Sequence, residues 1–197
     1  MLVSGAMTER LAAGLARVLA ERERTVLDRP DKTVAAVLVP MLEVDGEPHL
    51  LYTRRSTALP SHQGQVAFPG GRRDPGDTDL LATALREAHE EIGLEPARTQ
   101  VLGALDDIET MSTRYVITPF VALTAPPHRW TPSPSEVDAI FTVPLRVLRA
   151  PETLRQEVWE FNGRRVPVDT YPVNGHVIWG ATQRITGNLL DLVACLD

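Results

Sequence analysis

The sequence predicts a single α+β domain, in which a few helices pack against a sheet built from β-hairpins. Three segments, near both ends and in the middle of the chain, have the 3.6-residue periodicity of amphipathic helices. Between them lie short strand-like segments, two pairs of which are separated by Asp45-Gly46 and Asn162-Gly163, dipeptides that favour tight hairpin turns. A chain of 197 residues is long enough to bury one core without disulfides or a structural metal.

Composition excludes several other classes of protein. Hydrophobic residues (43%) and charged residues (23%) are present in the proportions of a globular domain, not of a collagen-like or disordered chain. The longest apolar stretch, residues 34–42, contains Pro40 and is too short to cross a bilayer. The single cysteine, Cys195, rules out internal disulfides and cysteine-based zinc sites. Glu9 and Arg17 interrupt what would have to be the apolar core of a secretory signal, so we expect a cytoplasmic protein with no membrane association.

The N-terminal part predicts a helix followed by a hairpin. We expect the helix over residues 8–28 and strands over residues 34–42 and 49–53, joined at Asp45-Gly46. We therefore divide the chain into an N-terminal helical extension, residues 1–30, and a single domain, residues 31–197. Met1 and Met7 are both candidate start residues. The apolar face of the helix consists of Leu11, Leu15, Val18 and Leu19.

The middle of the chain predicts a long loop and then a helix. Residues 54–76 contain seven prolines and glycines and are expected to be loop. Asp77 or Thr78 can cap the start of the helix, and Gly93 stands where a helix end favours a left-handed residue. The apolar residues expected on one face of this helix are Leu81, Leu85, Ala88 and Ile92.

The C-terminal half predicts mainly strands. We expect them over residues 101–105, 115–123, 139–143, 158–161, 164–168 and 176–179. A proline-rich surface loop is expected over residues 125–134, a short helix over residues 144–154 and a closing helix over residues 181–196.

Charge is concentrated in two neighbouring segments. Residues 74–95 hold seven acids and one base, whereas residues 53–73 hold four arginines and no acid. This arrangement suggests a site that handles both anions and cations, although solvated surface charge is the alternative. No predicted helix carries the basic stripe of a nucleic-acid-binding protein, so we expect no nucleic-acid partner.

Three carboxylates lie along one edge of the middle helix. Glu87 is three residues before Glu90 and four before Glu91, spacings that bring the side chains together. They repel one another and crowd the C-terminal end of the helix, where the macrodipole disfavours anions. Arg86 can pair with Glu90 and relieve part of this repulsion. A hard cation, Mg²⁺ or Mn²⁺, is expected to relieve the rest, with all three glutamates as ligands.

The surrounding residues resemble the signature of the Nudix hydrolase family. Residues 64–71 read GQVAFPGG and residues 86–94 read REAHEEIGL, with Asp77 between them where the family usually has Glu. One residue more than usual separates Asp77 from Arg86. Residues 50–56 read LLYTRRS and residues 178–182 read IWGAT, which is similar to the coenzyme A pyrophosphatase branch. Pro60 stands where many members of that branch carry Arg.

The resemblance implies a Nudix-type α/β/α sandwich with a mixed sheet and flanking helices. It also implies metal-dependent hydrolysis of the pyrophosphate bond of coenzyme A and its derivatives to 3′,5′-ADP and (acyl-)4′-phosphopantetheine. In that scheme Glu87, Glu90 and Glu91 bind metal and Arg86 orients Glu90. The residues expected to bind substrate are Arg54, Arg55, Ser56, Gly70 and Gly71.

Several alternatives stay open. Glu136 is the first candidate for a general base, with Asp106, Asp107 and Glu109 behind it. Because Pro60 replaces the expected arginine, the substrate is alternatively ADP-ribose, a dinucleotide or an oxidised nucleotide. A non-catalytic nucleotide-binding regulator is a third option. The assembly state is undetermined, with a homodimer as one option.

Overall fold

The computed structural model describes residues 5–58, 62–110, 114–125, 130–161 and 163–196. Its helices are α1 (Gly5–Glu21), α2 (Leu80–Ile92), α3 (Leu145–Leu148) and α4 (Gly180–Ala194), with a short 3₁₀ turn at Pro96–Arg98. The strands are β1 (Thr33–Val44), β2 (Glu47–Arg55), β3 (Val66–Ala67), β4 (Gly70–Arg72), β5 (Thr99–Ala104), β6 (Ile108–Glu109), β7 (Tyr115–Thr124), β8 (Val137–Pro144), β9 (Arg155–Phe161), β10 (Arg164–Val173) and β11 (His176–Trp179).

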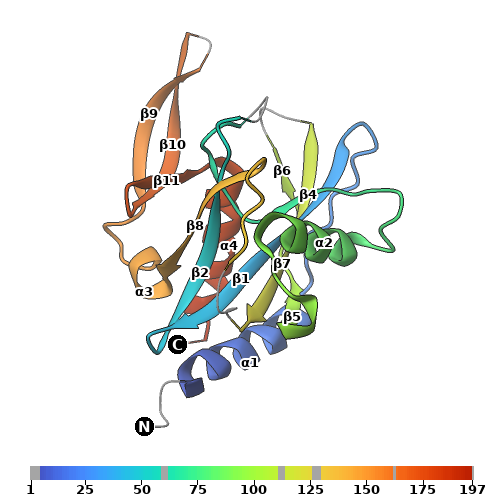
Figure 1. Ribbon diagram of the computed structural model, residues 1–197. Helices are drawn as coiled ribbons and strands as arrows, with labels where there is room; N and C mark the ends of the chain where they lie inside the picture. The colour runs from blue at the N-terminus through green and yellow to red at the C-terminus, as the bar shows by residue number, and fades with distance from the viewer. Residues whose placement is uncertain (1–4, 59–61, 111–113, 126–129, 162, 197) are drawn as a thin grey trace.

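The first eight strands form one mixed sheet. Its central order is β3-β2-β1-β7-β5, with β4 paired to β1, β6 to β7 and β8 to β2. β1 and β7 run parallel, and the other pairs are antiparallel. Strands β9, β10 and β11 form a second, antiparallel sheet, from which the β9–β10 hairpin projects (Figure 1).

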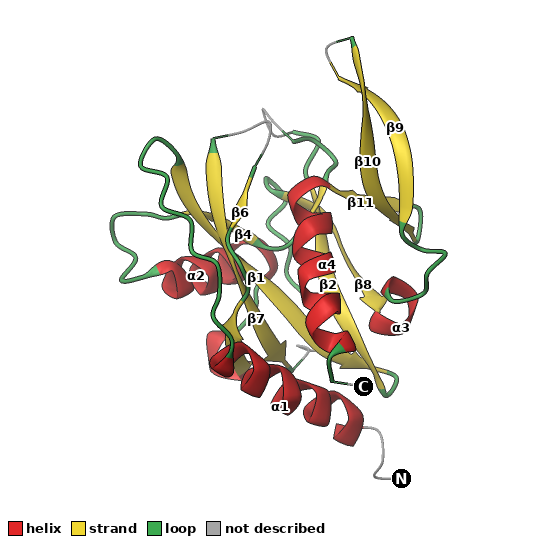
Figure 2. Cartoon of the chain, turned by 180° about the vertical axis from the view of Figure 1, so that it is seen from behind, coloured by secondary structure: helices red, strands yellow, loops and turns green. Residues whose placement is uncertain are grey.

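Helices cover both faces of the large sheet. Along β1, Leu38 and Leu42 pack with Ala84, Ala88 and Ile92 of α2. The alternating residues Val39 and Met41 belong to the larger cluster, to which α1 and α4 contribute Leu15, Leu19 and Leu189. The two-residue period of a strand thus places α2 on one face and α1 and α4 on the other (Figure 2). The α+β prediction, with a mixed sheet and flanking helices, is confirmed. No helix among the described residues is both long and apolar enough to span a bilayer.

The first helix is shorter than predicted. It ends at Glu21, and the following residues have no regular secondary structure but bond to the connection between β5 and β6. Arg22 and the backbone N–H of Thr25 donate to Asp106, and Arg24 and the N–H of Leu27 donate to Asp107.

Other boundaries also differ from the predictions. The segment expected as loop contains β3 and β4, β6 was not predicted, and α3 has four residues. The N-cap of α2 is Asp79, whose Oδ1 accepts from the N–H of Ala82 at 2.8 Å. Asp77 is engaged elsewhere. The left-handed C-cap at Gly93 is confirmed, with φ 70°. The hairpin at Asp45-Gly46 is also confirmed, and both residues have positive φ.

Candidate active site

The carboxylates of α2 differ in their exposure, because the helix lies with one edge against β4. Glu91 points to the sheet and is 4% exposed, whereas the Glu90 side chain is 55% exposed. Glu87 lies between these extremes, at 16%. The buried residues of α2 are Thr83, Ala84, Ala88, Glu91 and Ile92, so Ala84 and Glu91 take the place of the predicted Leu81 and Leu85, which are half-buried.

Two consecutive glycines in β4 make room for this edge of the helix. A Cβ at Gly71 would lie 2.5 Å from the carboxyl carbon of Glu87. A Cβ at Gly70, whose φ is 154°, would lie 2.3 Å from the carbonyl oxygen of Ala36. Because these residues have no Cβ, the backbone of β4 can lie close to the Glu87 carboxyl group on one side and to the backbone of β1 on the other. The N–H of Gly70 donates to Oε2 of Glu91 at 3.2 Å, so both glycines adjoin carboxylates.

Arg86 connects the helix to the loop before it. Its Nε and Nη2 donate to the two carboxylate oxygens of Asp77 at 2.9 and 3.0 Å. Its Nη1 donates to Oε1 of Glu87 and to Oε2 of Glu90, both at 3.0 Å, so the pair expected between Arg86 and Glu90 is present. Asp77 also accepts from Thr83 and from the N–H of Asp74.

These contacts give Asp77 a defined structural place. Hydrogen bonds from Arg86, above all, hold the pKa of Asp77 well below its usual range. A fixed anion at this position orients the guanidinium, because the fork of an arginine pairs with both carboxylate oxygens. The extra residue before Arg86 does not prevent this pairing.

Burial makes the inner part of the site unfavourable for negative charge. It raises the pKa of Glu91 to about 8, although the N–H of Gly70 and the charge of Arg55 act in the opposite direction. Burial also raises the pKa of Glu87, despite the favourable bond from Arg86. The negative charge of Glu136 raises the pKa of both glutamates further, so Glu136 lies close enough to act on them. Additional positive charge here would favour the ionised forms.

The donor set fits a hard divalent cation. Its groups are carboxylate oxygens, and the most buried, Glu91, has a raised pKa that a cation would lower. In the described ranges, no three acidic, histidine or cysteine side chains are already grouped as metal ligands. Arg86 instead bonds Glu87 and Glu90, so these side chains are engaged with a guanidinium in this structure.

The segment that carries Glu136 is tied to both α2 and β2. The N–H of Ser133 donates to the carbonyl of Glu91, and the N–H of Ser56 donates to the carbonyl of Glu136, both at 2.8 Å. These bonds hold the backbone of the segment that carries Glu136 to α2 and to the residue after β2. The Oγ of Ser56 accepts from the N–H of Ala58, and this serine is buried.

The other three candidate bases are engaged in a different part of the fold. Asp106 and Asp107 form ion pairs with Arg22 and Arg24 at 3.0 and 2.8 Å. Glu109 pairs with Arg29 and Lys32. These acids fasten the segment after α1 to the sheet, and their ion pairs give them a structural role.

The two arginines at the end of β2 have different neighbours. The charge of Arg55 acts on Glu91, whereas the charge of Arg54 acts on His176 of β11. The pairing of β2 with β8 is irregular between these two residues, and their charges act on different elements, α2 and β11. Arg55 is the arginine placed toward the carboxylates. Pro60 lies outside the described residues.

Comparison with known proteins identifies similar sequences. The NUDIX domain model matches residues 32–163. A protein named "Uncharacterized Nudix hydrolase NudL" from Photorhabdus laumondii is 42% identical over 159 residues, which is 81% of this chain and 84% of that protein. A protein of the same name from Salmonella paratyphi B is 39% identical over 146 residues, covering 74% and 69% of the two chains.

A solved structure resembles the fold over most of the chain. The MutT/nudix family protein from Enterococcus faecalis covers 92% of this chain and 69% of its own, with a TM-score of 0.51. At 11% sequence identity, this likeness concerns the fold alone.

Proposed function

The chain belongs to the Nudix hydrolase family, and from this premise we propose that it hydrolyses the pyrophosphate bond of coenzyme A and its acyl derivatives. It is a pyrophosphohydrolase that acts on nucleoside diphosphate derivatives, as the family does. The products of the proposed reaction are 3′,5′-ADP and 4′-phosphopantetheine or its acyl form. We further propose that Mg²⁺ or Mn²⁺ serves as the divalent cation and that the reaction takes place in the cytoplasm.

The observation that carries the hydrolytic function is the burial of Glu91 against β4. A carboxylate that is 4% exposed, with a pKa raised to about 8, is costly to keep ionised in the absence of a cation. Perturbed carboxyl groups of this kind are concentrated at functional sites. Nothing in the packing of α2 alone requires an acid at this position, because the neighbouring buried residues Ala88 and Ile92 are apolar.

Each residue of the site then has a proposed role. Glu87, Glu90 and Glu91 would hold the cation, which would neutralise the diphosphate and lower the pKa of a bound water. Asp77 holds Arg86, and Arg86 positions Glu87 and Glu90. Glu136 is the candidate general base, supported by its effect on the pKa of Glu87 and Glu91.

The substrate assignment depends on the segment from Leu50 to Ser56. Arg55 supplies a cation beside the carboxylates and is the arginine we expect to contact the diphosphate. Arg54, whose charge acts on His176 of β11, is a second proposed contact for another part of the substrate. The resemblance of this segment to coenzyme A pyrophosphatases is what favours coenzyme A over other nucleoside diphosphate derivatives.

The direct test is identification of the products by mass spectrometry. We expect coenzyme A incubated with the protein and Mg²⁺ or Mn²⁺ to yield 3′,5′-ADP and 4′-phosphopantetheine in equal amounts. Acetyl-coenzyme A should be cleaved at the same bond and retain its acyl group on the pantetheine product. A product mixture without phosphopantetheine would refute the substrate assignment.

Pro60 favours one alternative within the same reaction class. An arginine expected for coenzyme A is absent at this position, so ADP-ribose, a dinucleotide or an oxidised nucleotide is the second candidate substrate. Comparing kcat/KM for coenzyme A and ADP-ribose separates the two assignments. A higher kcat/KM for ADP-ribose would support the hydrolase function but show that ADP-ribose, not coenzyme A, is the preferred substrate.

A further inference from the structure

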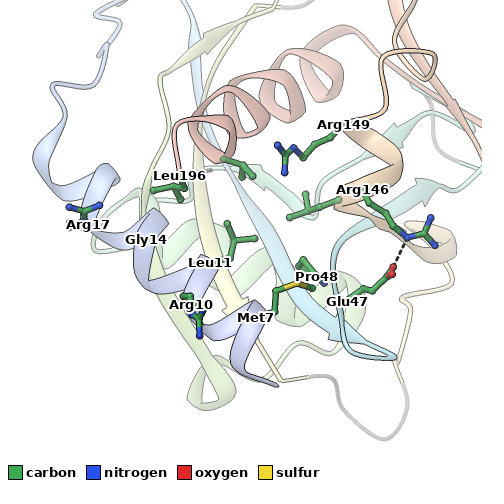
Figure 3. A pocket seen from close by; sticks show the side chains of 12 residues that line it. Met7, Arg10, Leu11, Gly14, Arg17, Glu47, Pro48, Arg146, Arg149 and Leu196 are labelled. Carbon is green, nitrogen blue, oxygen red and sulfur yellow. Dashed lines mark hydrogen bonds and ion pairs between the residues drawn. The ribbon is translucent and has the colours of Figure 1, made fainter. Parts of the chain in front are cut away.

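A pocket separate from the candidate active site lies between α1, the beginning of β2, α3 and the end of the chain after α4 (Figure 3). Its volume is about 610 Å³, within the range of roughly 300–1,000 Å³ that is typical of small-molecule sites. None of its lining residues belongs to the carboxylate cluster on α2 or to the segment from Leu50 to Ser56.

One part of the pocket wall is apolar. Met7 and Leu11 contribute to it from α1, and Leu196 contributes from the chain after α4. Met7 is 51% exposed, so a large apolar side chain stands in solvent at this pocket. Covering such a surface with hydrocarbon is favourable, because it removes apolar area from water.

Arginines supply the charge of the pocket. Arg10 and Arg17 come from α1, and Arg146 and Arg149 come from α3 and the residue that follows it. The one acid in the lining, Glu47, is already paired with Arg146 at 2.7 Å. With four arginines and one acid, the pocket lining is positively charged, whereas the chain as a whole has a net charge of −6.

We propose that this arginine-rimmed pocket binds a single-chain amphiphilic anion. The hydrocarbon tail lies against Met7, Leu11 and Leu196, and the carboxylate or phosphate head pairs with the guanidinium groups. A small inorganic anion would leave the apolar wall in water, and a neutral lipid would make no use of the positive charge of Arg10 and Arg17, the two exposed arginines of α1 in the lining. Only a ligand with a hydrocarbon tail and an anionic head contacts both the apolar wall and the arginines.

Methionine-methyl NMR of the full chain tests the proposal at the pocket itself. With ¹³C-methyl methionine, the Met7 resonance is assigned from its loss in Met7→Leu, and dodecanoate and dodecyl phosphate are titrated below their micelle concentrations. We expect a saturable shift of Met7 with at least one of these anions. Decanoate or decyl phosphate should bind about tenfold more weakly, since each buried CH₂ contributes about a threefold to fourfold change. Acetate and dodecyl maltoside, which lack the tail and the charge respectively, should give no shift at the same concentrations.

Charge reversal provides the matched comparison. Arg10→Glu combined with Arg17→Glu should weaken anion binding at least tenfold, whereas Arg165→Glu, at an exposed arginine on β10, should leave it unchanged. Equal rates of nucleotide hydrolysis in the wild-type protein, the double variant and Arg165→Glu would confirm that all three are folded. The proposal is overturned if dodecyl maltoside binds as tightly as the anions, or if the double variant binds normally. A Met7 shift seen only with vesicles of anionic phospholipid would also overturn it, in favour of a membrane surface.

Discussion

At the scale of single residues, the candidate site depends on close contact between glutamates of α2 and glycines of β4. Glu91 is buried by the approach of the helix, and Gly71 leaves the space that the Glu87 carboxylate occupies. The spacing in the sequence predicts that the glutamates share an edge, but it does not predict their burial. Helical periodicity counts a glutamate as polar, so the inward position of Glu91 depends on contact with a strand that the sequence did not reveal.

Gly71→Ala tests this fit directly. The added Cβ would lie 2.5 Å from the carboxyl carbon of Glu87 and must displace that group. Misplacement of a catalytic group by about 1 Å can cost on the order of 10²-fold in rate, and we expect a loss of that size. The control is Gly76→Ala in the loop between β4 and α2, where a Cβ meets nothing within 4 Å. Equal hydrolysis rates in the two variants would show that Glu87 need not occupy this place.

Arg86 and Asp77 show what spacing can and cannot predict. The pair between Arg86 and Glu90 follows from the i, i+4 rule and is present. The bidentate pair between Arg86 and Asp77 spans nine residues and a turn, so no local rule predicts it. The sequence offered one indication of a role for Asp77: it is an acid in a glycine-rich loop shortly before an amphipathic helix. The different neighbours of Arg54 and Arg55 are likewise not predictable from spacing, because the pairing of β2 with β8 is irregular between these two residues.

At the scale of elements, the segment after α1 is held to the sheet by ion pairs rather than by helical structure. Asp106 accepts from Arg22 and from the N–H of Thr25, and it also accepts from Asn188 of α4. One carboxylate thus joins the N-terminal segment, the β5–β6 connection and the last helix. The sequence predicts a helix as far as residue 28, because local propensity does not register these distant acceptors.

Replacing Asp106 should change stability in a pH-dependent way. Burial alone would raise the pKa of Asp106, but the bonds from Thr25, Arg22 and Asn188 outweigh it and lower the pKa below the ordinary value. The stabilisation by the ionised group is therefore present above the pKa of an unfolded aspartate, about 3.9, and is lost as pH falls through the lower folded value. We expect Asp106→Asn to lower the free energy of unfolding by about 1 kcal/mol at pH 7, with a smaller difference at pH 3.

Urea unfolding at the two pH values measures this difference. Asp28→Asn is the matched control, since Asp28 is an exposed aspartate in the segment after α1, to which Asp106 bonds. It should leave the unfolding free energy unchanged at both pH values. A deficit in Asp106→Asn that is as large at pH 3 as at pH 7 would contradict the role assigned to the ionised carboxylate.

At the scale of the whole molecule, the sheet places the active site and the arginine-rimmed pocket in different parts of the fold. The α+β class, the three long helices, the hairpin at Asp45-Gly46 and the strand His176–Trp179 are all predictable, because each has a local pattern. Strands β3, β4 and β6 have two or three residues and are held by pairing with β2, β1 and β7. Such strands depend on neighbours that are distant in the sequence. The glycines and prolines of residues 54–76 therefore predicted loop where β3 and β4 lie, and no local pattern indicated β6.

Titration of Mn²⁺ monitored by electron paramagnetic resonance measures whether the glutamates of α2 hold the divalent cation that hydrolysis requires. We compare the wild-type protein with Glu91→Gln and with Glu95→Gln, a control at an exposed glutamate just after the helix. We expect Glu91→Gln to remain folded, to bind Mn²⁺ at least tenfold more weakly and to lose on the order of 10²-fold or more in hydrolysis, whereas Glu95→Gln should behave as the wild type. Equal Mn²⁺ affinity and equal hydrolysis in the wild-type protein and Glu91→Gln would contradict this role of the glutamates.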